Sequence, residues 1–213
     1  SSHGGKVQTM DTLTSATSAP LDVIFTSGTE CNDDGGSLLD FHFEKYASTT
    51  GEIIAWIESM DMSSTTNKTV LMYYGKAGAT DQRDETGTWD ADYTGVWHVA
   101  SSTTGLATYD STSNDNDGTA TSYIGGIGNI DGGAFNNAAS GNISVPDAVE
   151  LRPTAAITYG LWVKADTLND DYPLFKEGAS TGYGFYTTGA GTVLRGYIRI
   201  DALWRDNIML NPP

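Results

Sequence analysis

The densest group of side chains that could bind a cation lies between residues 109 and 119, in the sequence YDSTSNDNDGT. Carboxylate and amide oxygens presented by a loop are the ligands that calcium prefers. Asp110, Asp115 and Asp117 are therefore the candidate calcium ligands. A solvated hairpin that holds no metal is the competing interpretation, and the residue types alone do not decide between the two. Beyond calcium, no cofactor is predicted.

The aromatic residues suggest a second kind of site, a surface that stacks on carbohydrate. The chain holds five Trp and eleven Tyr, and the apolar faces of sugar rings pack well on flat aromatic rings. Trp56 and Trp162 lie inside apolar runs, which predicts core positions for both. Tyr172, Tyr183 and Tyr186 lie closer to turns and are the candidate carbohydrate-binding residues.

No arrangement of residues typical of an enzyme is found in the sequence. Residues 178–182 match the G-x-S-x-G elbow of α/β-hydrolases, but that mechanism needs a helix after the serine and a histidine later in the chain. The histidines, His3, His42 and His98, all precede it. No strand carries alternating acids that would place a glycosidase pair of carboxylates on one face. We therefore expect a protein that is not an enzyme.

The histidines are not expected to bind zinc, and the single cysteine is expected to be an unreactive thiol. The three histidines are far apart and lack the spacing of zinc ligands, so no zinc site is predicted. Cys31 is flanked by Glu30 and by two aspartates, and neighbouring carboxylates disfavour the reactive thiolate.

The charge balance limits the partners that the chain can bind. Lys and Arg number 11 against 27 Asp and Glu, which gives a formal net charge of −16. Phosphate recognition needs clustered basic residues, so nucleic acid is excluded as a partner, and so is an anionic membrane surface. No apolar run approaches 18 residues, so no insertion into a membrane is predicted.

Short strands separated by turn-forming clusters run through the chain, and no apolar pattern with helical spacing persists over three turns. Strands spaced by about ten residues with Gly-rich turns predict an all-β protein built from antiparallel β-sandwiches. In residues 193–200 the alternation predicts that Leu194, Ile198 and Ile200 face inward while Arg195, Tyr197 and Arg199 face outward. The predicted strands are residues 22–26, 41–46, 53–57, 70–74, 158–163, 183–186 and 193–200.

Two motifs carry a resemblance to a known family. Residues 70–75 (VLMYYG) and 89–98 (WDADYTGVWH) resemble an uncharacterised β-domain that precedes laminin-G-like, concanavalin A-type modules in prokaryotic surface proteins and phage proteins. The resemblance covers roughly residues 22–200. Its second part, which resembles the start of the laminin-G-like module, is carried by residues 126–129, 135–136, 143–146 and 157–164.

The resemblance and the loosening of the strand pattern near residues 95–105 imply a domain organisation. We expect an N-terminal arm at 1–20, an uncharacterised β-sandwich domain at 21–98, and a laminin-G-like domain at 99–213. Both domains are expected to be jelly-roll or concanavalin A-like sandwiches that abut one another. The second is expected to be incomplete, because residues 203–210 do not match the family's continuation and the sequence covers about half of the usual sandwich.

The resemblance also implies a location outside the cell, on a cell surface or on a virion. An incomplete sandwich exposes a sheet edge or an apolar face that something must cover. One hypothesis is a non-enzymatic structural or adhesive module, part of a longer surface protein, with glycans as its ligands. The alternative is a self-assembling subunit of a virion, appendage or filament, in which other copies of the chain complete the sheets by strand addition.

Overall fold

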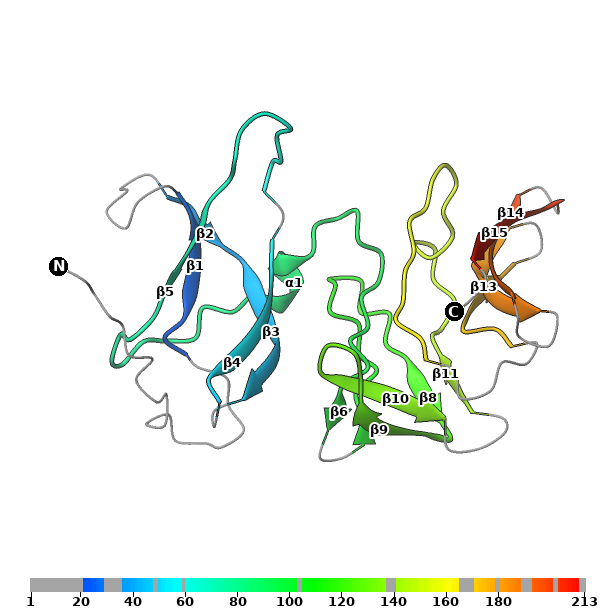
Figure 1. Ribbon diagram of the computed structural model, residues 1–213, viewed down its shortest axis with the longest axis horizontal. Helices are drawn as coiled ribbons and strands as arrows, with labels where there is room; N and C mark the ends of the chain where they lie inside the picture. The colour runs from blue at the N-terminus through cyan, green and yellow to red at the C-terminus, as the bar shows by residue number, and fades with distance from the viewer. Residues whose placement is uncertain are drawn as a thin grey trace. The chain divides into compact units, whose positions relative to one another are not determined.

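A computed structural model shows the chain as a series of small antiparallel sheets (Figure 1). It describes residues 21–28, 36–47, 50–58, 60–102, 105–136, 141–164, 171–178, 181–188, 193–200 and 203–210. Every pairing between described strands is antiparallel, and the one described helix is four residues long. The prediction of an all-β, antiparallel protein is confirmed. The predicted N-terminal arm and Cys31 lie outside the described residues.

The contacts within the chain divide it into two compact units, residues 1–147 and residues 148–213. This division does not coincide with the domain boundary predicted at residues 98 and 99. In unit 1, the backbone N–H of Ser111 donates to the carbonyl of Val96, and the indole of Trp97 donates to the carbonyl of Asn116. These bonds join the chain on both sides of that boundary. The boundary concerns sequence domains and stays a prediction.

Unit 1 begins with a three-stranded sheet and a hairpin. β1 (Ile24–Ser27) lies between β2 (Leu38–Leu39) and β5 (Val70–Tyr73), in the order β2-β1-β5. β3 (Phe41–Ala47) pairs with β4 (Glu52–Ile57). β1, β3, β4 and β5 lie within one or two residues of the strands predicted from the sequence, whereas β2 was not predicted.

The core of unit 1 joins that sheet to the hairpin. Val23, Phe25, Leu39 and Phe41 are buried together, and the rings of Phe25 and Phe41 meet edge to face with centroids 5.0 Å apart. Burial of a side chain of this size contributes about 1.5–3 kcal/mol. Leu39 is the last residue of β2 and Phe41 is the first residue of β3. One short stretch of chain therefore contributes core side chains from both the sheet and the hairpin. Partly buried residues of the hairpin and the following loop complete the core: Phe43, Ile53, Ala55, Ile57 and Met60.

After β5 the chain forms a long irregular segment, one short helix and three two-stranded ribbons. The helix, α1 (Glu85–Thr88), begins at Asp84, whose Oδ1 accepts the N–H of Gly87 at 2.8 Å and so caps the helix. The ribbons pair β6 (Ser101–Ser102) with β7 (Gly105–Leu106), β8 (Thr119–Thr121) with β11 (Asn142–Ser144), and β9 (Tyr123–Ile127) with β10 (Gly132–Asn136).

Unit 2 contains a four-stranded sheet in the order in which its strands follow along the chain. The strands are β12 (Leu174–Glu177), β13 (Gly182–Thr188), β14 (Val193–Ile200) and β15 (Leu203–Leu210). The predicted strands at 183–186 and 193–200 are confirmed. Throughout the described chain, no helix has the length and apolar character needed to cross a bilayer.

The strand predicted at residues 158–163 is wrong. These residues pair with none of the described strands, and Trp162, predicted to be in the core, is 76 % exposed. A strand needs a hydrogen-bonded neighbour to bury its backbone polar groups, and here the apolar run has no such neighbour in the described chain. Leu161 and Val163 are exposed as well.

Candidate functional site

The carboxylate of Asp110 organises the acidic loop that the sequence analysis singled out. Asp110 is buried. Its Oδ1 accepts the backbone N–H groups of Val96 (2.8 Å) and Thr112 (3.0 Å). Its Oδ2 accepts the hydroxyl of Thr112 (2.9 Å) and the N–H of Asn116 (3.0 Å). Four donors therefore fill both oxygens, and this buried carboxylate holds the loop to the segment that precedes it.

The other two candidate calcium ligands belong to the same loop but take different roles. Oδ1 of Asp117 accepts the backbone N–H of Asp110 at 2.8 Å. Asp115 has a left-handed backbone, with φ of +54°. No group of three or more His, Cys, Asp or Glu side chains within the described residues is arranged to hold a metal ion. The calcium site therefore stays a prediction, while the geometry gives Asp110 a hydrogen-bonding role.

Two of the three candidate carbohydrate-binding tyrosines lie together in unit 2. The ring of Tyr172 stacks on that of Tyr186, with centroids 6.0 Å apart and planes at 29°. Tyr172 also meets Phe175 edge to face at 5.3 Å. Tyr172 is 61 % exposed and Phe175 is 51 % exposed. We call these three residues the aromatic platform.

Tyr183, the third candidate, lies on the opposite face of β13 from Tyr186, because side chains alternate along a strand. Its ring lies 5.5 Å from that of Tyr159, and its hydroxyl donates to the carbonyl of Leu151 at 3.2 Å. These contacts fix Tyr183 within the packing of unit 2, away from the aromatic platform.

Beside the platform, Tyr197 of β14 corrects the prediction that this residue faces outward into solvent. It is almost fully buried, and its ring lies 5.9 Å from that of Tyr186. A Cβ on Gly184 would lie 2.9 Å from Cε1 of Tyr197, so the ring can lie this close to β13 only because residue 184 has no side chain. Burial, and then the charge of Glu177, raises the pKa of Tyr197 to about 12.

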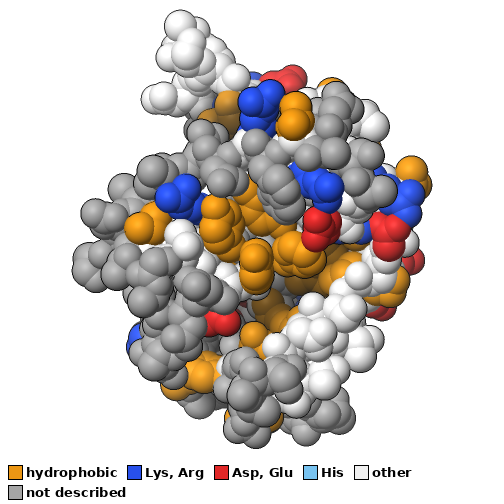
Figure 2. Space-filling view, turned by 90° about the vertical axis from the view of Figure 1, so that its right-hand side faces the viewer, with side chains coloured by type: hydrophobic (Ala, Val, Ile, Leu, Met, Phe, Trp, Pro, Cys, Tyr) orange, Lys and Arg blue, Asp and Glu red, His pale blue; other side chains and the backbone are white. Residues whose placement is uncertain are grey.

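Figure 2 shows the molecule from the side on which Figure 1 draws β13, β14 and β15. Hydrophobic side chains gather around a hollow on this face, with basic and acidic side chains close to its edge. The sheet supplies charged groups of both signs: Arg199 donates to Glu177 at 2.7 Å. An apolar hollow edged by hydrogen-bonding groups is typical of small-ligand sites.

A second cluster, in unit 1, was not predicted as a site. It is built on a β-bulge: the register of β3 and β4 shifts between Phe43 and Lys45, which leaves Glu44 without an opposite residue. Bulges of this kind redirect a side chain. Oε2 of Glu44 accepts the indole N–H of Trp56 at 2.5 Å and lies 3.2 Å from Nδ1 of His98.

The two histidines of this cluster face each other through their Nε2 atoms, which are 2.9 Å apart. The contact between His98 and Glu44 assigns a proton to Nδ1 of His98, so its Nε2 accepts and Nε2 of His42 donates. Nδ1 of His42 is buried and has no hydrogen-bond partner. Burial, and then the charge of His98, lowers the pKa of His42 from 6.5 to about 4.

Tryptophan rings enclose the histidine pair. The ring of Trp89 lies 5.7 Å from His42 and 6.1 Å from His98, and that of Trp56 lies 5.9 Å from His98. Trp89 follows α1, so the capped turn at Asp84 places this ring against the hairpin. Burial of His42 against these rings is the main reason why its imidazole resists protonation, although a polar pocket lies on the other side of the pair.

A polar pocket of about 340 Å³ opens beside the histidine pair. Its wall holds three carboxylates, those of Glu44, Asp81 and Glu85, against one guanidinium, that of Arg83. Oε1 of Glu85 accepts the hydroxyl of Ser111 at 2.6 Å. The remaining lining residues are His42, Phe43, His98, Ala100 and Tyr109.

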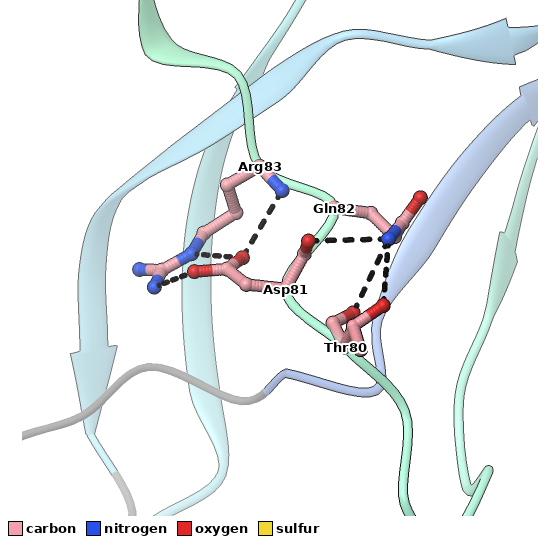
Figure 3. Close-up of polar contacts among 4 residues, drawn as sticks. All are labelled: Thr80, Asp81, Gln82 and Arg83. Carbon is pink, nitrogen blue, oxygen red and sulfur yellow. Dashed lines mark hydrogen bonds and ion pairs between the residues drawn. The ribbon is translucent and has the colours of Figure 1, made fainter.

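Asp81 and Arg83 of this pocket belong to a segment, Thr80 to Arg83, whose polar contacts Figure 3 shows. Nε of Arg83 donates to Oδ1 of Asp81 at 2.8 Å, and Nε2 of Gln82 donates to Oγ1 of Thr80 at 3.0 Å. The bond from Arg83 lowers the pKa of Asp81, and the same bond raises the pKa of Arg83. Both groups are therefore charged at neutral pH.

Thr80 and Gln82 line a second, larger cavity of about 700 Å³. It lies against the β2-β1-β5 sheet and is lined there by Ile24, Leu71 and Tyr73. Oδ2 of Asp22, also in its lining, accepts the N–H of Gly75 at 2.8 Å. One short segment thus separates two cavities of different character, one largely polar and one partly apolar.

Residues 21–119 match a family described as a domain of unknown function (DUF2341). The match spans both histidines, Glu44 and the three aspartates of the loop. It supports the part of the resemblance that concerns an uncharacterised β-domain, while the laminin-G-like module after it stays a prediction. No curated protein and no solved structure matches the chain.

We expect Asp110→Asn to lower the free energy of unfolding by about 1–3 kcal/mol, because an amide nitrogen would then face backbone donors. Urea denaturation followed by circular dichroism, in EDTA and in calcium chloride, measures the change. Asp115→Asn is the control, since asparagine tolerates the left-handed backbone of that position. A loss that appears only in the presence of calcium would contradict the hydrogen-bonding role and favour the calcium site.

We expect the chain to lose stability as the pH falls from about 6.5 to about 4. The pKa of His42 is about 4 in the folded chain and 6.5 as an ordinary value, so the unfolded chain takes up the proton first. At about 1.4 kcal/mol per pKa unit, the loss reaches up to about 3 kcal/mol. Urea denaturation at several pH values, followed by tryptophan fluorescence, measures it.

The matched variant for this pH dependence is His42→Gln, which removes the titrating group. Its free energy of unfolding should vary less over the same pH range, whatever its value at pH 7. Equal pH dependence in both proteins would show that His42 is not the group responsible.

Proposed function

We propose that the protein is a non-enzymatic structural or adhesive β-domain protein of an extracellular or virion surface, and that its C-terminal sheet binds carbohydrate. The observation that carries this proposal is the aromatic platform: Tyr172 stacked on Tyr186, with Phe175 beside them. Aromatic rings with one open face give a sugar ring an apolar surface on which its C–H groups can pack.

The exposure of the platform supports a binding role over a packing role. Tyr172 and Phe175 leave more than half of their surface in solvent, although both are large hydrophobic side chains. Solvent-exposed aromatic groups are enriched where a partner covers them. Tyr186, which supports Tyr172, is held in turn by its contact with buried Tyr197. The platform therefore rests on a rigid base.

Charged groups lie on the same face of the sheet as the platform. In the strand register Arg195 lies opposite Tyr186, and Arg199 lies opposite Gly182. Because residues opposite one another share a face, both arginines lie on the side of Tyr186. Guanidinium and carboxylate groups hydrogen-bond sugar hydroxyls and would fix the orientation of a stacked ring. The net charge of −16 favours neutral glycans over anionic ones.

We expect Tyr172→Ala to weaken glycan binding by about tenfold or more, because a covered aromatic ring contributes about 1.5–3 kcal/mol. A glycan array identifies the ligand, and isothermal titration calorimetry with that glycan measures the loss. Tyr74→Ala, which removes an exposed tyrosine of unit 1, is the control and should bind like the unchanged protein. An array without any bound glycan, or equal losses in both variants, would contradict the proposal.

A second function, assembly with copies of the same chain, is favoured by the exposed run Leu161-Trp162-Val163. The hydroxyl of Tyr159 anchors the start of this run by donating to the carbonyls of Gly184 and Tyr197. The following apolar residues are presented to solvent. Exposed apolar stretches without a sheet partner are typical of surfaces that pair with another chain.

If the run mediates assembly, light scattering coupled to size-exclusion chromatography should find oligomers whose fraction rises with protein concentration. Trp162→Lys should shift this equilibrium toward the monomer, because a charge would replace the largest apolar group of the run. Tyr172→Ala is the matched control in unit 2 and should leave the equilibrium unchanged. A monomer at every concentration would rule out assembly through this run.

A further inference from the structure

We propose that His42 and His98 form a binding site for a divalent transition-metal ion, and that Cu²⁺ is the ion that their geometry fits best. The proposal concerns unit 1 and goes beyond the carbohydrate-binding function proposed for unit 2. It rests on three features of the histidine pair: the distance between the two Nε2 atoms, the carboxylate behind one ring, and the pocket in front of both.

The distance between the Nε2 atoms suits two ligands of one ion. Imidazole nitrogens bind such metals at about 2.0–2.1 Å. Two nitrogens at that distance and at right angles about the ion lie about 2.9 Å apart, whereas tetrahedral angles separate them by about 3.3 Å. The observed separation is 2.9 Å. Right angles between nitrogen ligands are typical of tetragonal Cu²⁺ and Ni²⁺ sites, and of the two Cu²⁺ binds more tightly.

The carboxylate of Glu44 provides the outer support that a metal-binding histidine usually has. A ligating imidazole normally donates its other N–H to a carboxylate or carbonyl, which fixes the ring and raises its basicity. Nδ1 of His98 lies 3.2 Å from Oε2 of Glu44. The indole of Trp56 holds the same oxygen from β4, and the bulge directs Glu44 toward it. Nε2 of His98 is thereby left to face His42.

The polar pocket gives a metal ion a path to the pair and room for its remaining ligands. Both histidines line it, and at about 340 Å³ it has space for several water molecules. Its three carboxylates outnumber the single guanidinium, so the pocket attracts cations. Within the described chain, no third His, Cys, Asp or Glu is arranged with the two Nε2 atoms as a metal ligand, since Glu44 contacts the far nitrogen of His98. The protein therefore supplies two ligands and water completes the coordination.

The competing interpretation is that the pair only shares a proton in a hydrogen bond. A metal ion would take the place of that proton, which moves to Nδ1 of His42, the ring nitrogen that has no hydrogen-bond partner. Both Nε2 atoms would then direct lone pairs at the ion. The two interpretations differ in one measurable respect, because a shared proton gives no affinity for copper.

The test uses the full chain with His3→Ala, which removes the remaining histidine of the sequence. After treatment with EDTA and its removal, the protein is titrated with Cu²⁺ at pH 7.5. We expect one bound ion per chain, with electron paramagnetic resonance showing two coordinating nitrogens. Tryptophan fluorescence should fall on binding, because the rings of Trp56 and Trp89 lie about 6 Å or less from a histidine.

Variants locate the site within the chain. In the same background, His42→Gln and His98→Gln should each abolish the two-nitrogen signal. Glu44→Gln keeps both ligands and should weaken binding by about 10- to 100-fold. Tyr172→Ala, in unit 2, is the control and should bind copper unchanged. Zn²⁺ should compete with Cu²⁺ but more weakly.

Two results would overturn the proposal: no copper-dependent signal in the folded His3→Ala protein, or copper binding that survives replacement of either histidine. If a glutamine variant does not fold, the nitrogen signal and the fluorescence loss in the His3→Ala protein decide alone. Their absence refutes the site, and their presence together supports it, because only His42 and His98 then remain as imidazole ligands.

Discussion

The buried carboxylate of Glu44 is the group on which the arrangement of the described part of unit 1 depends most. Only 5 % of its side chain is exposed, and a buried charge is tolerated only when partners replace the lost water. Those partners come from two other segments, Trp56 on β4 and His98 beyond α1. Satisfying one charge thus joins the hairpin to a segment more than fifty residues further along the chain. The pocket and the histidine pair exist where they do because of this connection.

The buried carboxylate of Asp110 has a similar role in the acidic loop, where its hydrogen bonds also join two segments of the chain. Its four donors come from the loop and from Val96, so it holds the loop closed against the chain that precedes it. Glu44 and Asp110 together fix both ends of the segment from residue 96 to residue 98. Glu44 and Asp110 have become structural because their carboxylates are buried and hydrogen-bonded.

The sequence predicted the positions of individual strands well, but it predicted the contacts between distant segments of the chain poorly. The strands predicted at 22–26, 41–46, 53–57, 70–74, 183–186 and 193–200 match β1, β3, β4, β5, β13 and β14 within one or two residues. His42 and Glu44 stand two residues apart in β3, the spacing that puts side chains on one face of a strand, and this spacing was the available signal for the unpredicted cluster. It could not show that His98 meets them, because that contact depends on the bulge and on the path of the chain after α1. Trp162 was predicted wrongly for a related reason: an apolar run forms a strand only if another strand lies beside it.

The segment from Thr80 to Arg83 places a constraint on how unit 1 can change during evolution. Consecutive residues alternate between two cavities: Thr80 and Gln82 line one, and Asp81 and Arg83 line the other. Gain or loss of a single residue here would disturb both linings at once, because neighbouring residues of the segment line different cavities. The length of this short segment is therefore as important to both cavities as the identity of its residues.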